Sequence, residues 1–241
     1  MPTDQEPTAE QIAEVRTAIL KKLEAEPPAE PFHPNDLKRL KDSDLWISKL
    51  LKIYEFDLEK TNTRLWDNLI WRQSFGVNDI TVNSLNQEFL NDGSIYAHNK
   101  DRDGKPLLII SMKKHSKSRN LDDLIRIIVY WVERLQQETN LDKITLFMDM
   151  TGSGLSNMDI DFIKANIGIF ETKYPYVPNY IIVHELPFLL NAAFKIVKTF
   201  LPEEALRILR VTTKKDLDQY VDKDNCLKLW GGNDDYEYKF S

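Results

Sequence analysis

Residues 180–201 read YIIVHELPFLLNAAFKIVKTFL, a short apolar run followed by a longer one. The first part, Tyr180–His184, is short, apolar and β-branched, which is typical of a buried strand. The second part, Leu190–Phe200, has the length and spacing of a helix, and Leu186-Pro187 before it is placed to act as a hinge. This order of strand, hinge and helix indicates an α/β architecture.

The polar residues of this helix occupy one narrow stripe. Asn191, Lys195 and Lys198 are spaced i, i+4 and i+7, and the rest of the helix is apolar or small. An ordinary surface helix has an apolar face of roughly 100°, and this face is wider. Two interpretations remain open. The segment is either a core helix whose lysines extend to the surface, or a helix that lines a cavity inside and touches a membrane outside.

Basic residues continue after the helix. Between residues 195 and 215, six lysines and arginines against two glutamates leave a local charge of +4 on a chain whose net charge is −6. These residues form either a solvated face or a patch that faces a membrane. In the second case each charge near an anionic surface contributes about 1 kcal/mol.

Strands and helices alternate around this stretch. The turn DRDGKP at residues 101–106 carries an Asp-Gly step and predicts a β-hairpin. The other elements follow from apolar spacing. The predicted strands are Ser94–Ala97, Leu107–Met112, Ile144–Met150, Tyr180–His184 and Ile208–Thr212, and the predicted helices are Asn120–Glu138, Met158–Tyr174 and Leu190–Phe200. Such alternation indicates a mixed, partly parallel β-sheet covered by helices.

The first quarter of the chain has only helical patterns. Thr8 and Gln11 have the spacing of a capping box, and Asp57 is placed to cap a helix that runs to Ser74. Four prolines in Glu26–Pro34 predict a stiff linker. We therefore divide the chain into residues 1–34 (tail, helix and proline-rich linker), residues 35–80 (an all-helical lobe) and residues 81–241 (the α/β domain).

Composition narrows the class of function. A net charge of −6 argues against general nucleic-acid binding, which needs a basic face. The single cysteine, Cys226, excludes an intrachain disulfide and fits a reducing compartment. No apolar run reaches the roughly 18–20 residues that span a bilayer, and the acidic start MPTDQEPTAE is unlike a signal peptide. We expect a location in the cytoplasm. If the chain is part of a longer, anchored protein, we expect it on the cytosolic face of a membrane.

The sequence predicts no catalytic or metal site. The four histidines are His33, His98, His115 and His184. None of them has a metal-ligand spacing with another or with the cysteine. The loop Thr151–Gly154 lacks the Gly-Lys-Ser/Thr end of a phosphate-binding loop. An enzyme on this sheet would have to use Asp149, His184 and this loop; that remains a third hypothesis, and we expect no cofactor other than a bound lipid.

Several stretches, in the right order, resemble the CRAL-TRIO (Sec14-like) family. They are Phe56-Asp57 and Trp71-Arg72 in the helical lobe, Asp149–Gly152 with Leu155-Ser156, the segment Tyr174–Leu209, and LKLWGG at Leu227–Gly232. The resemblance covers about residues 35–235. It implies a lipid-binding domain in which a helical lobe precedes the sheet, and in which a mobile gate helix closes over a hydrophobic pocket.

Within the family, the run NAAFKIVKT at Asn191–Thr199 is most similar to the CRAL-TRIO domains of motile sperm domain-containing proteins. Longer proteins of that kind carry a major-sperm-protein domain and an anchor in the endoplasmic reticulum. The resemblance therefore implies a role at membrane contact sites, the endoplasmic reticulum or lipid droplets. Members that bind phosphatidylinositol have Glu-Arg after the Tyr-Pro, where this chain has Tyr176-Val177, so that ligand is not carried over.

The carrier interpretation assigns a pocket, a gate and a membrane contact. A sixteen-carbon acyl chain loses roughly 13 kcal/mol on transfer to water, at about 0.8 kcal/mol per methylene, so a carrier needs an apolar cavity and a door. The expected pocket and gate residues are Leu108, Ile110, Phe147, Ile182, Phe188, Leu190, Phe194, Val197, Phe200 and Leu201. The expected headgroup or membrane contacts are Lys195, Lys198 and Arg207.

The expected function is non-enzymatic binding, and intermembrane transfer, of a phospholipid or similar lipid. Its expected partners are that lipid and a membrane surface, without nucleic acid. The alternative is a module with a vestigial cavity that attaches to membranes or lipid droplets, or to another protein, through the exposed apolar helix.

Overall fold

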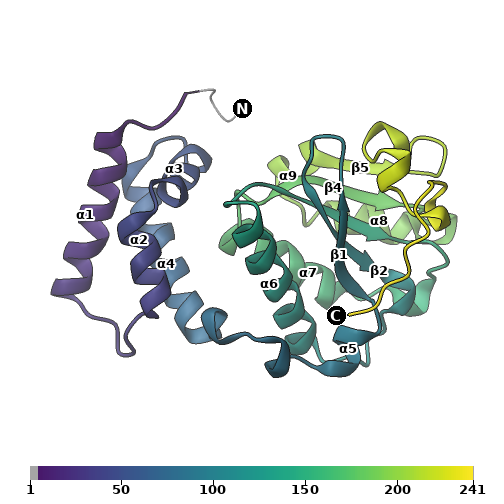
Figure 1. Ribbon diagram of the computed structural model, residues 1–241, viewed down its shortest axis with the longest axis horizontal. Helices are drawn as coiled ribbons and strands as arrows, with labels where there is room; N and C mark the ends of the chain where they lie inside the picture. The colour runs from purple at the N-terminus through teal and green to yellow at the C-terminus, as the bar shows by residue number, and fades with distance from the viewer. Residues whose placement is uncertain (1–4, 241) are drawn as a thin grey trace. The chain divides into compact units, whose positions relative to one another are not determined.

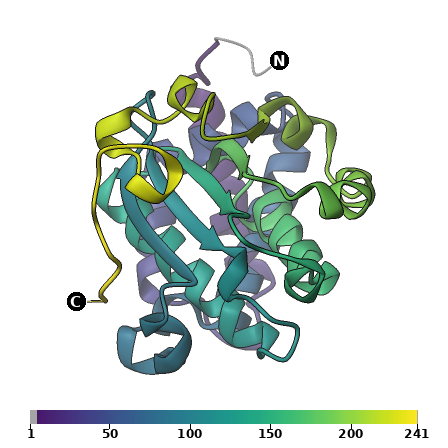
Figure 2. The same ribbon diagram turned by 90° about the vertical axis from the view of Figure 1, so that its right-hand side faces the viewer.

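The computed structural model describes residues 5–240, and Figure 1 and Figure 2 show them from two directions. The chain divides into two compact units. The first unit contains the chain up to Ile80 together with Thr172–Tyr176, and the second contains Thr81–Glu171 and the residues from Val177 onward.

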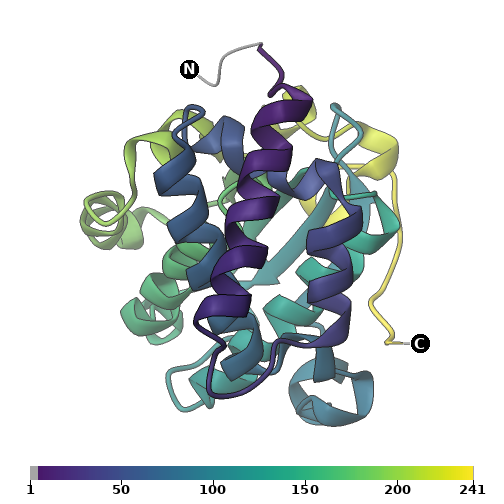
Figure 3. The same cartoon turned by 90° about the vertical axis from the view of Figure 1, so that its left-hand side faces the viewer.

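The first unit is helical, and Figure 3 shows α1 in front of its other helices. Its elements are α1 (Ala9–Ala25), α2 (Pro34–Asp42), α3 (Asp44–Ile53), α4 (Leu58–Phe75) and the 3-10 turn η1 (Val77–Asp79). Both predicted caps are confirmed. Thr8 and Gln11 form the capping box of α1, and Asp57 accepts a hydrogen bond from the amide of Lys60 at the start of α4. Pro34 is the first residue of α2 rather than part of the linker, because a proline fits the first helical position.

A distant segment of sequence completes this unit. The Tyr174 ring packs edge-on against Trp71 with centroids 5.8 Å apart. The side-chain amide of Asn68 donates to the carbonyl of Lys173 at 2.8 Å. The α4 helix therefore holds residues that lie about a hundred positions later in the chain.

The second unit contains one five-stranded sheet in the order β1-β2-β3-β4-β5. Its strands are β1 (Ile95–Lys100), β2 (Pro106–Ser111), β3 (Ile144–Asp149), β4 (Pro178–His184) and β5 (Leu209–Thr212). The hairpin β1–β2 is antiparallel, and all other pairs are parallel. The expected mixed, partly parallel sheet is thus confirmed.

Within the described residues, besides several short 3-10 turns, five α-helices and one π-helical turn accompany the sheet. They are α5 (Gln87–Asn91), α6 (Leu121–Glu138), α7 (Ile160–Gly168) with the π-helical turn η5 (Ile169–Lys173), α8 (Asn191–Lys198) and α9 (Glu203–Ile208). The sequence patterns did not predict α9. It begins directly after Pro202 and delays the start of β5 to Leu209.

The sheet has two differently covered faces. Figure 1 shows α6 on one side and the yellow C-terminal segment on the other. On the second side, which we call the tail face, the Phe147 ring lies 4.3 Å from that of Trp230, and the Tyr96 ring lies 4.8 Å from that of Tyr238. We call the opposite side the open face.

Candidate functional site

The open face of the sheet is incompletely covered. Strand register places Leu108, Leu146, Ile181 and Leu209 in one row across this face, and Ile110, Met148, Val183 and Val211 in the next. Near α6 the side chains are fully buried, with Leu108 at 0% and Ile110 at 3% exposure. Toward β5 the side chains are more exposed: Ile181 and Leu209 are only partly buried, and Val211 is 50% exposed. The apolar open face is therefore only partly covered toward β4 and β5: Ile181, Leu209 and Val211 are not fully buried, although Leu146 and Val183 are buried and α9 packs against β4.

Helix α7 presents a second apolar surface of the same kind. Ile160, Ile163 and Ile167 have helical spacing, so they lie on one stripe, and all three are only partly buried. Lys164 lies on the same stripe, and its Nζ is 4.6 Å from the centre of the Phe200 ring. This stripe of α7 thus faces the end of the segment that was predicted to be the gate.

The predicted gate segment is exposed on its outer side. Phe188 is 90% and Leu189 66% exposed in the turn before α8, and Ile196 is 56% exposed on α8 itself. Its inner anchors are Leu190 at 0% and Val197 at 8% exposure. The core-helix interpretation does not fit, because a core helix would not leave these side chains in water.

The remaining predicted gate residues are intermediate. Phe194, Phe200 and Leu201 are partly buried, and the Nζ of Lys198 lies 5.6 Å from the Phe194 ring centre. The side chains therefore form a surface that is neither packed as a core nor fully exposed.

The expected basic contacts differ in availability. Lys195 and Lys198 are exposed at the last turn of α8. Arg207 is exposed too, but it forms an i,i+4 ion pair with Glu203 on α9. Its charge is therefore locally compensated, and the two lysines are the stronger candidates for headgroup contact.

The structure does not bring the four predicted pocket residues of the strands to one surface. Leu108 and Ile110 point to the open face, whereas Phe147 and Ile182 point to the tail face. The reason is the period of two in a strand: neighbours along a strand point to opposite sides. Leu146, Phe147 and Met148 are all apolar, so the sequence did not show which of them shares a face with Leu108; the register of β2 and β3 selects Leu146 and Met148.

The arrangement that an enzyme would need is not accessible. His184 is 0% exposed, and its Nδ1 lies 3.1 Å from the hydroxyl of Thr212. Burial lowers the pKa of His184, so its neutral form is favoured. Asp149 is 5% exposed and accepts a hydrogen bond from the Thr151 amide at 3.0 Å. Both side chains have structural roles at the ends of their strands.

Metal ligands and membrane-spanning helices also bear on what the site can do. Within residues 5–240, no three His, Cys, Asp or Glu side chains are grouped so that they could hold a metal ion. Over the same residues, no helix has the length and apolar character that crossing a bilayer requires.

The helical unit followed by a mixed five-stranded sheet with flanking helices is an α/β fold of the Sec14-like type. The family model for the CRAL/TRIO domain matches residues 90–232. Because this match covers more than half of the chain, the chain belongs to the CRAL-TRIO family.

Known proteins show how far the relationship extends. A CRAL-TRIO domain-containing protein of Schizosaccharomyces pombe is 25% identical, over 83% of this chain and 48% of its own length. The phosphatidylinositol transfer protein CSR1 of Eremothecium gossypii is 24% identical, over 57% of this chain and 33% of its own. The chain thus spans about half of one curated relative and a third of the other. The crystal structure of Sfh5 shares the fold with a TM-score of 0.71 at 18% identity, covering 97% of this chain and 91% of that one.

Proposed function

We propose that this chain binds a phospholipid or similar lipid between the open face of the sheet, α7 and the gate segment Leu186–Leu201, without catalysis. The observation that carries the proposal is the incompletely covered apolar surface at Ile181, Leu209 and Val211 of β4 and β5, in the same unit as a gate segment that exposes Phe188, Leu189 and Ile196. A lipid tail supplies the packing partner that this surface lacks, at about 25 cal/mol for each Å² removed from water. The relative from Eremothecium gossypii is named for phosphatidylinositol transfer, which supports the same chemistry.

Membrane docking through α8 belongs to the same proposal. Lys195 and Lys198 are exposed beside Ile196, so α8 offers cations and an apolar side chain together. Such a helix lies in the interface of a membrane, with its apolar side down and its lysines on headgroups. The cytosolic faces of the endoplasmic reticulum, of contact sites or of lipid droplets are the membranes that we propose for it.

The headgroup that is recognised need not be inositol. Tyr176 and Val177 stand where members that bind phosphatidylinositol have Glu-Arg. Tyr176 is buried in the helical unit, where its hydroxyl accepts a hydrogen bond from Arg39 at 3.2 Å. We therefore propose a ligand whose recognition depends on its tails, with the headgroup left to be identified.

Native mass spectrometry of the chain after expression in cells tests the carrier proposal. We expect a co-purified lipid in the wild type and little or none in Ile181→Trp, because the indole fills the open face. Leu229→Trp is the matched control, since Leu229 is 56% exposed and belongs to the C-terminal segment on the other side of the sheet. A wild type that carries no lipid, or an Ile181→Trp variant that carries as much, would contradict the proposal.

The attachment module with a vestigial cavity remains the second candidate, because the gate segment already exposes Phe188 and Leu189. Flotation with liposomes separates it from the carrier. Wild type that floats without co-purified lipid, and Phe194→Asp with Phe200→Asp that does not float, would favour attachment alone.

A further inference from the structure

The loops after the parallel strands gather at one edge of the sheet. Because β2, β3, β4 and β5 run in the same direction, their carboxyl ends lie side by side. The loops that follow these ends are residues 112–120, 150–159, 185–190 and 213–216. We call this surface the carboxyl edge.

Three large apolar side chains project from the carboxyl edge. Leu155 is 60% exposed in the loop after β3, and Phe188 and Leu189 are 90% and 66% exposed in the loop after β4. One exposed leucine on a surface is ordinary. Three large apolar residues on the loops of adjacent strands form a patch of the kind that marks an interaction site.

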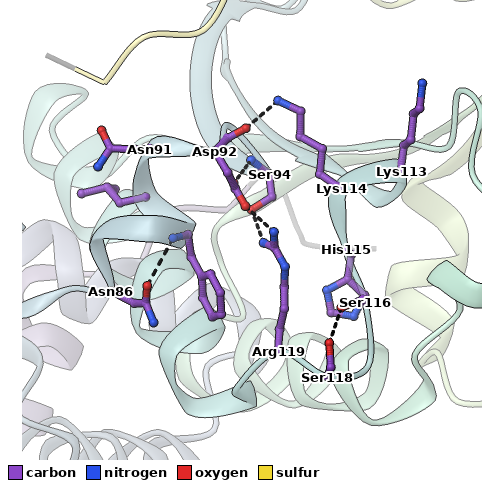
Figure 4. A network of polar contacts seen from close by, with 12 residues as sticks. Asn86, Asn91, Asp92, Ser94, Lys113, Lys114, His115, Ser116, Ser118 and Arg119 are labelled. Carbon is purple, nitrogen blue, oxygen red and sulfur yellow. Dashed lines mark hydrogen bonds and ion pairs between the residues drawn. The ribbon is translucent and has the colours of Figure 1, made fainter.

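Lysines flank this apolar patch on both sides. Lys113 and Lys117 are exposed in the loop after β2, and Lys214 and Lys215 are exposed in the loop after β5. Within residues 5–240, none of their four ammonium groups has a hydrogen bond or ion pair. In Figure 4, Lys113 points away from the polar network that its neighbours form, whereas Lys114 donates to the carbonyl of Asp92 at 2.6 Å.

The acidic residues of the same edge are held by contacts within the fold, Asp216 among them through the backbone amide of Thr213. Asp92 forms an ion pair with Arg119, as Figure 4 shows. Asp159 lies 3.0 Å from the Nε2 of His115, and Glu185 accepts a hydrogen bond from the Lys214 amide at 2.8 Å. The four loops contain six lysines and arginines against three acidic residues, Asp159, Glu185 and Asp216, so on a chain with net charge −6 the carboxyl edge has a local excess of positive charge around an apolar centre.

Hydrogen bonds hold these loops together. The Asn157 side chain donates to the carbonyls of His115 at 2.8 Å and Lys113 at 3.2 Å, which joins the loops after β2 and β3. The Met150 amide donates to the carbonyl of His184 at 2.9 Å, which joins the ends of β3 and β4. Binding by this edge requires little ordering of the loops, because the fold has already ordered them.

We propose that the carboxyl edge docks on an anionic bilayer, with Leu155, Phe188 and Leu189 at the depth of the headgroups and the flanking lysines on anionic lipids. This inference rests on the proposed function, which gives the reason why the protein binds to a membrane. It does not require a bound lipid. The membrane contact then includes the loops after β2, β3 and β5 as well as α8.

Vesicle flotation of the full chain tests the lysines. We expect binding to vesicles of phosphatidylcholine with phosphatidylserine, and much weaker binding to phosphatidylcholine alone. Lys113→Gln with Lys117→Gln lowers partitioning about thirtyfold, at about fivefold for each lysine near an anionic surface. Lys143→Gln is the matched control, because Lys143 is exposed at the opposite edge of the sheet, just before β3, and its removal leaves partitioning unchanged.

The apolar centre has its own variant pair. Leu155→Gln lowers partitioning about tenfold, since most of the apolar burial of one leucine is lost, while Leu155→Met retains it. The inference is overturned if Leu155→Gln and the double lysine variant both bind as the wild type does, or if vesicles without phosphatidylserine bind equally well. Native mass spectrometry of the same variants keeps the two proposals apart, because a docking variant still carries its lipid. Missing lipid in every form of the protein removes the carrier function but not edge docking.

Discussion

The Nε of Arg72 lies 2.8 Å from the Oδ1 of Asp36, and both side chains are 3% exposed. Arg72 comes from the last turn of α4, and Asp36 from the first turn of α2. The amide of Asn78 donates to the other carboxylate oxygen at 2.7 Å. This buried pair therefore ties three elements of the helical unit together through one carboxylate.

Loss of this carboxylate destabilises the protein strongly. Asp36→Ala is expected to lower the free energy of unfolding by about 3–5 kcal/mol, because a buried guanidinium loses its counter-ion. Asp44→Ala is the control: Asp44 also pairs with an arginine, Arg16, but its side chain is 72% exposed, so the loss is about 1 kcal/mol or less. Urea denaturation of both variants measures the difference, and equal losses would contradict the structural role of the buried pair.

The pH dependence of stability reports on His184. Burial lowers the pKa of this histidine, and the charge of Asp149 only partly opposes the shift. In the unfolded chain His184 takes up a proton near pH 6.5, whereas in the folded chain it does so only at lower pH. Between these two values the unfolded state binds more protons, so stability falls as the pH falls, by at most about 1.4 kcal/mol per pH unit.

His184→Gln tests this assignment, because glutamine retains a partner for Thr212 and does not titrate. The difference in unfolding free energy between about pH 7.5 and about pH 5.5 should be smaller in the variant than in the wild type. If the two proteins lose stability in parallel, His184 is not the group responsible.

Cys226 offers a chemical measurement of the C-terminal segment. The thiol is 4% exposed, and burial raises its pKa to about 11. Because the thiolate is the reactive form, the folded protein should not react with iodoacetamide at about pH 8, and the protein in urea should react fully. It is the only cysteine among the 241 residues, so labelling reports on this segment alone.

A glycine substitution makes that measurement specific. A Cβ at Gly232 would overlap the backbone carbonyl of Cys226, so Gly232→Ala should open the segment and expose the thiol. Gly168→Ala is the control, since no atom lies within 4 Å of its added Cβ. Rapid labelling of both variants, or of neither, would contradict this packing.

Local patterns predicted most of the fold. The capping box at Thr8, the cap at Asp57 and the Asp-Gly turn depend on neighbours in sequence, and all three are present. The packing of Tyr174 on Trp71 could not be found this way, because the two residues are about a hundred positions apart and no spacing rule links them. Residues Thr172–Tyr176 belong to the first unit because of tertiary contacts and not because of their place in the sequence.

The candidate site was only partly predictable for a similar reason. Breadth of apolar surface selected Leu186–Leu201 as a candidate gate, because that property belongs to a single segment. The strand residues of the pocket also required the register between strands, which places Phe147 on the opposite face from Leu108 and which no local pattern contains. Lys214 belonged to the basic stretch that was predicted to be either a solvated face or a membrane-facing patch, but its place at one edge with Lys113 was not predicted, since strand order and direction bring the two together.

A negative charge in the loop after β2 should weaken membrane docking. Ser118 is exposed, and its hydroxyl lies 2.8 Å from that of Ser116, between Lys117 and Arg119 in sequence. Ser118→Glu should lower partitioning onto vesicles with phosphatidylserine about fivefold, because it offsets the contribution of about one lysine. The difference from the wild type should shrink as salt is raised, since exposed charges more than a Debye length apart are screened.

Gln137→Glu is the control. It adds the same charge near the end of α6, close to the amino end of β3 in sequence, and should leave partitioning unchanged. Equal effects of the two substitutions would mean that overall charge, and not the carboxyl edge, controls binding.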